Sequence, residues 1–218
     1  MVRKTAALLV VLALASSWAH AVTVSPGSIV ALPGTTVAAE PDLKGTVVQD
    51  DILPFTISSP STSLTGEVQE RVVLAADGFY DFYWRVFVNP SSTDSVSALR
   101  LINFGPLAAN YNIDYRTDGL GSTAPNSVHR FPGAAANDYN FLFTTGIAPG
   151  SSSYFFFMDT NATGYAKNAA FDFTNLSDTG ISRLISTWGP SAPVPLPAAI
   201  WLLGSAVAGL GLFRRRSL

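Results

Sequence analysis

The 218-residue chain contains no cysteine, so neither a disulfide framework nor a thiolate catalytic or metal site is available to it. Histidine is almost as scarce, and only His129, within Ser127 to Phe131, lies in the part of the chain expected to fold. Acid–base catalysis by an imidazole would have to use this residue. No Gly-x-Ser-x-Gly elbow, His-Glu-x-x-His pair or phosphate-binding glycine loop occurs. These absences argue against the common hydrolase and nucleotide-dependent mechanisms.

Charged residues make up only 13% of the chain, and the basic ones are unevenly placed. Five of the thirteen Lys and Arg residues lie in the two terminal segments, whereas all fifteen Asp and Glu residues lie between them. The interior therefore carries eight basic against fifteen acidic residues, a net charge of about −7. Because binding to a phosphate backbone requires a basic face, nucleic acid is not an expected partner.

Residues 1–21 have the three parts of a secretory signal peptide. Arg3-Lys4 precedes an apolar run over residues 6–15, and Ala19-His20-Ala21 forms a small-x-small cleavage site. An uncleaved N-terminal membrane helix is the alternative, but the apolar run is short and a cleavage site follows it. We therefore expect export, with the mature chain beginning at Val22.

Residues 194–218 form a second three-part segment. The motif Pro195-Leu196-Pro197 precedes an uncharged stretch, residues 198–213, and Arg214, Arg215 and Arg216 follow it. Proline is tolerated in a first helical turn because its missing N–H has no partner there. As a helix the stretch would reach about 24 Å. That is short of a ~30 Å hydrocarbon core, but arginine snorkelling and local bilayer thinning can cover the rest. The flanking arginines favour the cytoplasmic side, which predicts one transmembrane helix and a body outside the cytoplasmic membrane.

This tail resembles the PEP-CTERM sorting signal of Gram-negative bacteria, in which a Pro-Glu-Pro-like motif precedes a Leu-, Gly- and Ala-rich helix and a run of arginines. The resemblance covers about the last twenty-five residues, and Leu196 stands where the usual motif has glutamate. It implies a transient single-pass membrane form, processing by exosortase, and a final place at the cell surface or outside the cell. It also associates the chain with exopolysaccharide and biofilm. The alternative is an ordinary single-pass anchor, although such an anchor needs no paired prolines. A helix buried in the core of the domain is the third possibility.

Residues 22–188 are predicted to form one exported all-β domain, followed by a linker at residues 189–193. Runs rich in aromatic and β-branched residues alternate with turn signals such as Asp77-Gly78, and no helical pattern of useful length interrupts them. Many short strands of this kind favour an antiparallel β-sandwich or jelly roll. Phe155 to Met158 lacks alternation, so we expect a central strand covered on both faces. The predicted strands lie within Gly45–Ile57 and at Glu67–Leu74, Phe79–Val88, Val96–Phe104, Tyr111–Arg116, Tyr139–Thr145, Tyr154–Asp159 and Ala169–Thr174.

Three kinds of site can be considered for this domain. Glycoside hydrolysis would need two carboxyl groups across a cleft. A calcium site could use oxygen ligands from the loops at 114–119 and 159–161, although neither follows a known ligand spacing. Sugar rings could stack on tyrosines that alternate outward along the strands. The candidate carboxylate pairs are Asp50 with Asp51, Asp77 with Asp81, Asp114 with Asp118, and Glu67 with Glu70. The abundant aromatic residues are Tyr80, Phe82, Tyr83, Trp84, Tyr111, Tyr115, Tyr139, Phe141, Phe143 and Tyr154.

The sequence thus predicts an exported, non-enzymatic protein of the cell surface or extracellular matrix, with a structural or interaction role. No catalytic residue, metal ligand or cofactor is assigned to it. The resemblance implies exosortase as a partner, the cytoplasmic membrane before processing, and an extracellular polysaccharide by association. A carbohydrate- or calcium-binding module is the alternative, and a secreted hydrolase is the third.

Overall fold

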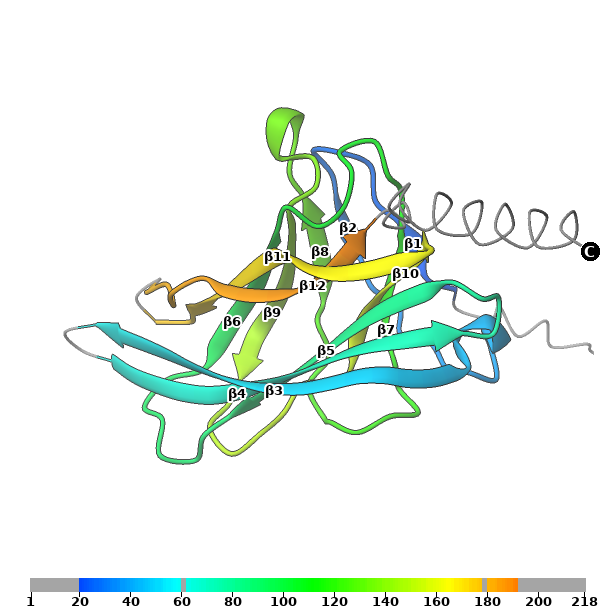
Figure 1. The fold of residues 1–218 in the computed structure, drawn as a ribbon. Coiled ribbons are helices and arrows are strands. Elements are labelled where there is room, and N and C mark those ends of the chain that lie inside the picture. Colours follow the sequence, from blue (N-terminus) through cyan, green and yellow to red (C-terminus); the bar gives the residue numbers. More distant parts are fainter. Residues whose placement is uncertain (1–19, 60–61, 178–179, 192–218) are drawn as a thin grey trace, which may run out of the picture.

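The computed structural model describes residues 20–59, 62–177 and 180–191 (Figure 1). Several predicted features lie outside these ranges: Ala19 of the cleavage site, the motif Pro195-Leu196-Pro197, the apolar stretch 198–213, and Arg214, Arg215 and Arg216. Among the described residues, none belongs to a helix long and apolar enough to cross a membrane.

The described chain is all-β, as predicted, and forms two antiparallel sheets of six strands each. Its only helices are two short 3₁₀ turns, η1 (Pro41–Leu43) and η2 (Gly133–Ala135). Sheet 1 consists, in spatial order, of β1 (Val22–Thr23), β7 (Asn112–Tyr115), β10 (Phe156–Ala162), β5 (Tyr80–Val88), β4 (Thr62–Ala75) and β3 (Gly45–Ser59). Sheet 2 consists of β12 (Ile185–Ser191), β11 (Gly164–Asn175), β6 (Val96–Ile102), β9 (Tyr139–Ile147), β8 (Ser127–Arg130) and β2 (Ile29–Ala31).

The main hydrophobic core lies between the two sheets. Alternate residues of each strand point into it, so Trp84 of β5 meets Phe141 and Phe143 of β9 around Phe156. Aromatic residues are the largest apolar side chains, and their burial is the main source of stability in a chain without disulfides. The two layers packed on one core correspond to the arrangement of a β-sandwich.

Strand β10 confirms the expectation drawn from its lack of alternation. It pairs with β5 on one side and β7 on the other, so it is an inner strand of sheet 1. Phe156 and Met158 point into the main core. Phe155 and Phe157 point to the opposite, outer face of sheet 1, where they are buried in a second cluster with Leu43, Val73 and Tyr83.

The Asp77-Gly78 signal also corresponds to a hairpin, which joins β4 and β5. Gly78 has a φ of 90°, a left-handed conformation that glycine adopts without strain. The Asp77 carboxylate accepts a hydrogen bond of 3.0 Å from the N–H of Phe79 and so stabilises the turn. The longest hairpin, β3–β4, pairs Gly45 with Ala75 and runs across the lower half of Figure 1.

The last strand corrects the predicted domain boundary. Residues 189–193 were expected to form a linker, but β12 runs to Ser191, and its Gly189 and Pro190 pair with Ala166 and Tyr165 of β11. Proline is acceptable there because β12 is an edge strand, where an N–H can point away from the ladder. The folded unit therefore extends at least three residues beyond Trp188.

The N-terminal end of the described chain is attached to sheet 1. β1 begins at Val22, which would be the first residue of the mature chain, and Val22 pairs with Ile113 of β7. Ala21, which cleavage would remove, donates its N–H to Glu40 at 2.6 Å. The lead-in after β1 contributes only the short edge strand β2.

Candidate binding pocket

The adjacent carboxylates Asp50 and Asp51 do not converge, because neighbouring residues of a strand point to opposite faces. Asp50 accepts hydrogen bonds from Arg71 at 3.0 Å and from Gln69 at 2.7 Å. Asp51 instead accepts hydrogen bonds from Lys167 and from the indole of Trp188, each at 3.0 Å. Each carboxylate is therefore paired on its own side of β3.

Asp114 and Asp118 fasten the N-terminal segment to sheet 1. Asp114 is fully buried, and its Oδ1 accepts the N–H groups of Gly34 and Tyr115, each at 2.8 Å. Asp118 accepts the N–H of Val37 at 2.9 Å and pairs with Arg116 Nε at 2.5 Å. Burial raises the pKa of Asp114 to about 6. The two carboxylates therefore have a structural role, since they attach the N-terminal segment to sheet 1. The positive charge of Arg116 beside Asp118 also disfavours the binding of a cation there.

In each of the other two predicted pairs, one carboxylate lies at the surface and the other in the interior. Asp77 and Glu67 are exposed, whereas Asp81 and Glu70 are buried. Within residues 20–59, 62–177 and 180–191, no group of three or more His, Asp or Glu side chains is arranged to hold a metal ion. Neither of the two segments considered for calcium, 114–119 and 159–161, is therefore part of such a group.

The structure brings together a different acidic pair, Asp81 of β5 and Asp159 of β10. Asp81 is 1% exposed and accepts the N–H of Thr160 at 3.1 Å, while Asp159 accepts a hydrogen bond of 3.0 Å from Asn112. Burial, and then the negative charge of Asp159, raises the pKa of Asp81 to about 8. The Asp81 carboxyl is therefore protonated at neutral pH and buried between strands.

A polar network connects the two sheets near β12. Thr187 accepts a hydrogen bond of 3.1 Å from Trp84 Nε1 and donates one to Glu70. Glu70 is 1% exposed, and Lys167 Nζ lies 3.5 Å from its other oxygen. Burial raises the pKa of Glu70, and the hydrogen bond from Thr187 and the charge of Lys167 partly offset this rise. The network explains how a carboxylate is accommodated in the core.

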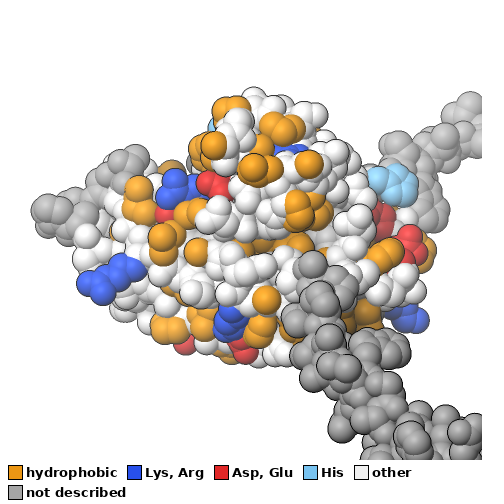
Figure 2. Space-filling view, turned by 45° about the horizontal axis from the view of Figure 1, so that its top comes forward, with side chains coloured by type: hydrophobic (Ala, Val, Ile, Leu, Met, Phe, Trp, Pro, Cys, Tyr) orange, Lys and Arg blue, Asp and Glu red, His pale blue; other side chains and the backbone are white. Residues whose placement is uncertain are grey.

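The expected outward row of aromatic side chains does not form. Seven of the ten aromatic residues singled out from the sequence are buried, and Tyr80, Tyr115 and Tyr154 are half-buried. Among the described residues, Phe87 is the only aromatic side chain classed with the large exposed hydrophobics, at 38% exposure. On the face shown in Figure 2, basic side chains are few and some lie directly beside acidic ones, and no broad basic area is visible. A flat platform for stacking sugar rings is therefore not present in this part of the chain.

His129 lies on β8, as its sequence context indicated. It pairs with Ile29 of β2 and Asn140 of β9, and its half-exposed ring packs 4.6 Å from the ring of Phe131. The neighbouring Arg130, which sequence reasoning did not single out, is the more distinctive residue. It is 1% exposed, lies 5.3 Å over the Tyr139 ring and donates five hydrogen bonds. Their acceptors are the carbonyl oxygens of Val24, Leu107, Ala109 and Ala136 and the side chain of Asn110.

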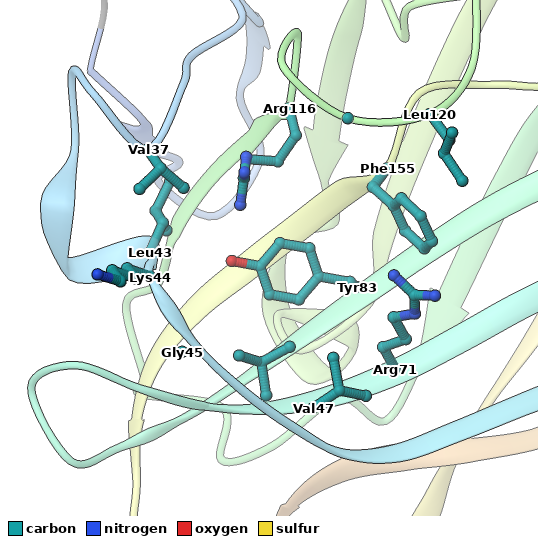
Figure 3. A pocket seen from close by; sticks show the side chains of 12 residues that line it. Val37, Leu43, Lys44, Gly45, Val47, Arg71, Tyr83, Arg116, Leu120 and Phe155 are labelled. Carbon is teal, nitrogen blue, oxygen red and sulfur yellow. The ribbon is translucent and has the colours of Figure 1, made fainter.

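A half-open pocket of about 380 Å³ lies on the outer face of sheet 1. Its floor is the second hydrophobic cluster. Its walls come from the N-terminal segment, from strands β3, β4 and β5, and from the loop after β7 (Figure 3). The principal lining side chains are Val37, Leu43, Lys44, Val47, Arg71, Tyr83, Arg116, Leu120 and Phe155.

The polar groups of this pocket are all hydrogen-bond donors or cations. Lys44, Arg71 and Arg116 are three of the eight basic residues between the predicted signals, and no carboxylate is among the lining residues. Arg71 lies 4.7 Å over the ring of Phe155, a cation–π distance. The Tyr83 side chain points its hydroxyl toward the space beside Arg116 (Figure 3).

Two buried donors of the pocket have no acceptor for their protons among the described residues, Nε of Arg71 and the hydroxyl of Tyr83, whose oxygen faces the Arg116 guanidinium. Tyr83 is 4% exposed, and burial raises its pKa, so the phenol is neutral and can donate a proton to an acceptor. Buried polar groups are nearly always paired in folded proteins. The arrangement is suited to binding a ligand that brings acceptor atoms.

Fold and site together define an all-β protein of two antiparallel sheets, with a cationic, partly apolar pocket on the outside of one of them. Comparison with protein-family models, with curated proteins and with solved structures finds no significant match to the chain. The pocket escaped sequence reasoning because its residues come from distant segments and follow no local motif.

Proposed function

We propose that this chain is an exported, non-enzymatic protein that is sorted by its C-terminal segment toward the cell surface or extracellular matrix. The observation that carries this proposal is the sequence Pro195-Leu196-Pro197 ahead of an uncharged stretch and Arg214 to Arg216. By resemblance, exosortase is the processing partner, and the cytoplasmic membrane holds the chain before processing. The crossings of the chain between its sheets support a jelly-roll-like classification of the exported domain.

A structural or interaction role is the proposal for the β domain itself. Four of the carboxylates considered for an acid–base mechanism are engaged in structural contacts: Asp114 and Asp118 hold the N-terminal segment, and Asp51 and Glu70 belong to the network near β12. Among the alternatives, a binding module has one specific observation in its favour, the pocket around Tyr83.

The sorting proposal is tested by cell fractionation. The native chain should be recovered at the cell surface or in the medium. A double variant, Pro195→Ala with Pro197→Ala, should remain in the cytoplasmic membrane, because the helix would still insert while the processing motif is lost. Pro193→Ala is the matched control, since it removes a nearby proline outside the motif, and it should behave like the native chain. Release of the double variant at the native level would contradict the proposal.

A further inference from the structure

We propose that the pocket on sheet 1 binds a carboxylate carried on a ring-sized carbon skeleton, held between Arg71 and Arg116 over Tyr83. This inference goes beyond the proposed function and does not depend on the tail, because the pocket is built from residues 37–155 alone. The ligand chemistry follows from three features of the pocket: its charge, its unpaired donors and its apolar walls.

The charge of the pocket favours an anion with one negative charge. Arg71 is already paired with Asp50 at 3.0 Å and Arg116 with Asp118 at 2.5 Å, so each guanidinium has one carboxylate partner outside the lining. Lys44, at the exposed rim, forms no ion pair with a carboxylate of the described residues and so leaves one positive charge unbalanced. A monoanion balances this excess, whereas a dianionic phosphate would exceed it.

The unpaired donors favour a carboxylate as the anionic group. In Figure 3, Arg116 enters from the loop after β7 and Arg71 from β4, with the Tyr83 ring between them. The Tyr83 hydroxyl and Arg71 Nε are buried donors without acceptors among the described residues. A planar carboxylate offers several acceptor positions that match the guanidinium fork, and hydrogen bonds to a charged group are stronger than neutral ones.

The apolar walls favour a carbon skeleton behind the carboxylate. Val37, Leu43 and Phe155 line the interior, and Val47 and Leu120 are 46% and 60% exposed at the opening. An inorganic anion would leave these walls in contact with water, whereas one face of a ring would cover them. The volume of about 380 Å³ lies near the lower end of the ~300–1,000 Å³ typical of ligand pockets, which fits a single ring or one residue of a polymer.

The proposal is tested by calorimetric titration of the full-length chain in detergent micelles, with protein-free micelles as the blank. The probes are glucuronate and benzoate, and their uncharged analogues glucose and benzyl alcohol are the matched ligand controls. We expect at least one of the two acids to bind at a single site, at least tenfold more tightly than its uncharged analogue. If only glucuronate binds, the ligand class is a sugar acid, and if only benzoate binds, it is an aromatic acid. If both bind, the pocket accepts ring carboxylates in general.

Variants assign the binding to this pocket. Arg116→Gln should weaken the affinity at least tenfold, and Tyr83→Phe, which removes only the phenolic hydroxyl, should weaken it several-fold. Arg183→Gln is the matched control, because Arg183 is an exposed arginine outside the pocket, and it should bind as the native chain does. If Arg116→Gln fails to fold, Tyr83→Phe decides the question. Binding of neither acid, equal binding of the uncharged analogues, or native affinity in Tyr83→Phe would overturn the proposal. Since the purified chain is titrated, this result is independent of the sorting experiment.

Discussion

The indole Nε1 of Trp84 on β5 donates a hydrogen bond of 3.1 Å to the hydroxyl of Thr187 on β12, and so connects sheet 1 to sheet 2 through the core. The same hydroxyl donates to the buried carboxylate of Glu70. One small side chain therefore satisfies a donor on β5 and an acceptor on β4. Because both partners are buried, neither could turn to water if the hydroxyl were removed.

Thr187→Val should destabilise the fold although it preserves the shape of the side chain. It leaves Trp84 Nε1 and one oxygen of Glu70 without partners, and each buried unpaired group costs about 1–3 kcal/mol. We expect the free energy of unfolding, measured by chemical denaturation, to fall by about 2–4 kcal/mol. Thr145→Val, at an exposed position of β9, is the control and should change it by no more than about 0.5 kcal/mol. A loss at Thr187 no larger than in the control would show that the network contributes little.

Arg130→Lys should be strongly destabilising, although it keeps the positive charge. The guanidinium donates five hydrogen bonds, to the β1–β2 segment and to two loops, and an ammonium cannot reproduce that planar fork. We expect a loss of about 3 kcal/mol or more in the free energy of unfolding, because several buried carbonyl groups lose a charged donor. Arg183→Lys, on the surface, serves as the control. A midpoint of thermal unfolding like that of the control would refute this role for Arg130.

The Asp81–Asp159 contact predicts an unusual dependence of stability on pH. The pKa of Asp81 is raised to about 8, far above the value of about 3.9 expected in the unfolded chain, so the folded state binds more protons between these values. Stability is therefore greatest toward the acidic end of this window and falls as the pH rises toward 8, by up to about 1.4 kcal/mol per pH unit. Asp114, with a pKa of about 6, acts in the same direction at lower pH.

Asp81→Asn isolates this effect, since the amide is neutral at every pH and can still accept the N–H of Thr160. Between pH 6 and 8, thermal unfolding midpoints of the native chain should fall, and those of Asp81→Asn should stay nearly level. The variant should consequently be the more stable form at pH 8. Parallel pH profiles for the two proteins would mean that Asp81 titrates normally.

Calcium should have no effect on the stability of the domain. Asp114 and Asp118 already accept backbone N–H groups and an arginine. Residues 159–161, expected to form a loop, lie within strand β10, where Asp159 accepts a hydrogen bond from Asn112. We expect identical thermal unfolding curves with millimolar calcium and with a chelator. An upward shift of the midpoint on adding calcium would reopen the metal-binding alternative.

The sequence allowed the all-β class, most strands and the inner position of β10 to be predicted because these depend on local composition. Phe155 to Met158 are apolar without alternation, and only a strand covered on both faces buries all four. Strand β12 was missed because Gly189 and Pro190 are local breakers. Their strand conformation depends on pairing with β11, a contact that no local signal reveals.

The interactions that define the interior and the pocket could not be predicted either, because they depend on contacts between segments that are distant in the sequence. Asp81 and Asp159 meet only because β5 and β10 are neighbours in a particular register. Arg71, Tyr83 and Arg116 share a pocket only because β4 and β5 lie beneath the loop after β7. Arg130 stands beside the conspicuous His129, yet its role depends on carbonyl groups from three other segments.

The central claim, that the C-terminal segment is a processing signal, is tested most directly by the intact mass of the protein recovered from the cell surface. The account predicts a chain that begins at Val22 and has lost everything beyond the motif Pro195-Leu196-Pro197. A mature form that retains Arg214 to Arg216 would contradict it, and would identify the segment as a plain membrane anchor.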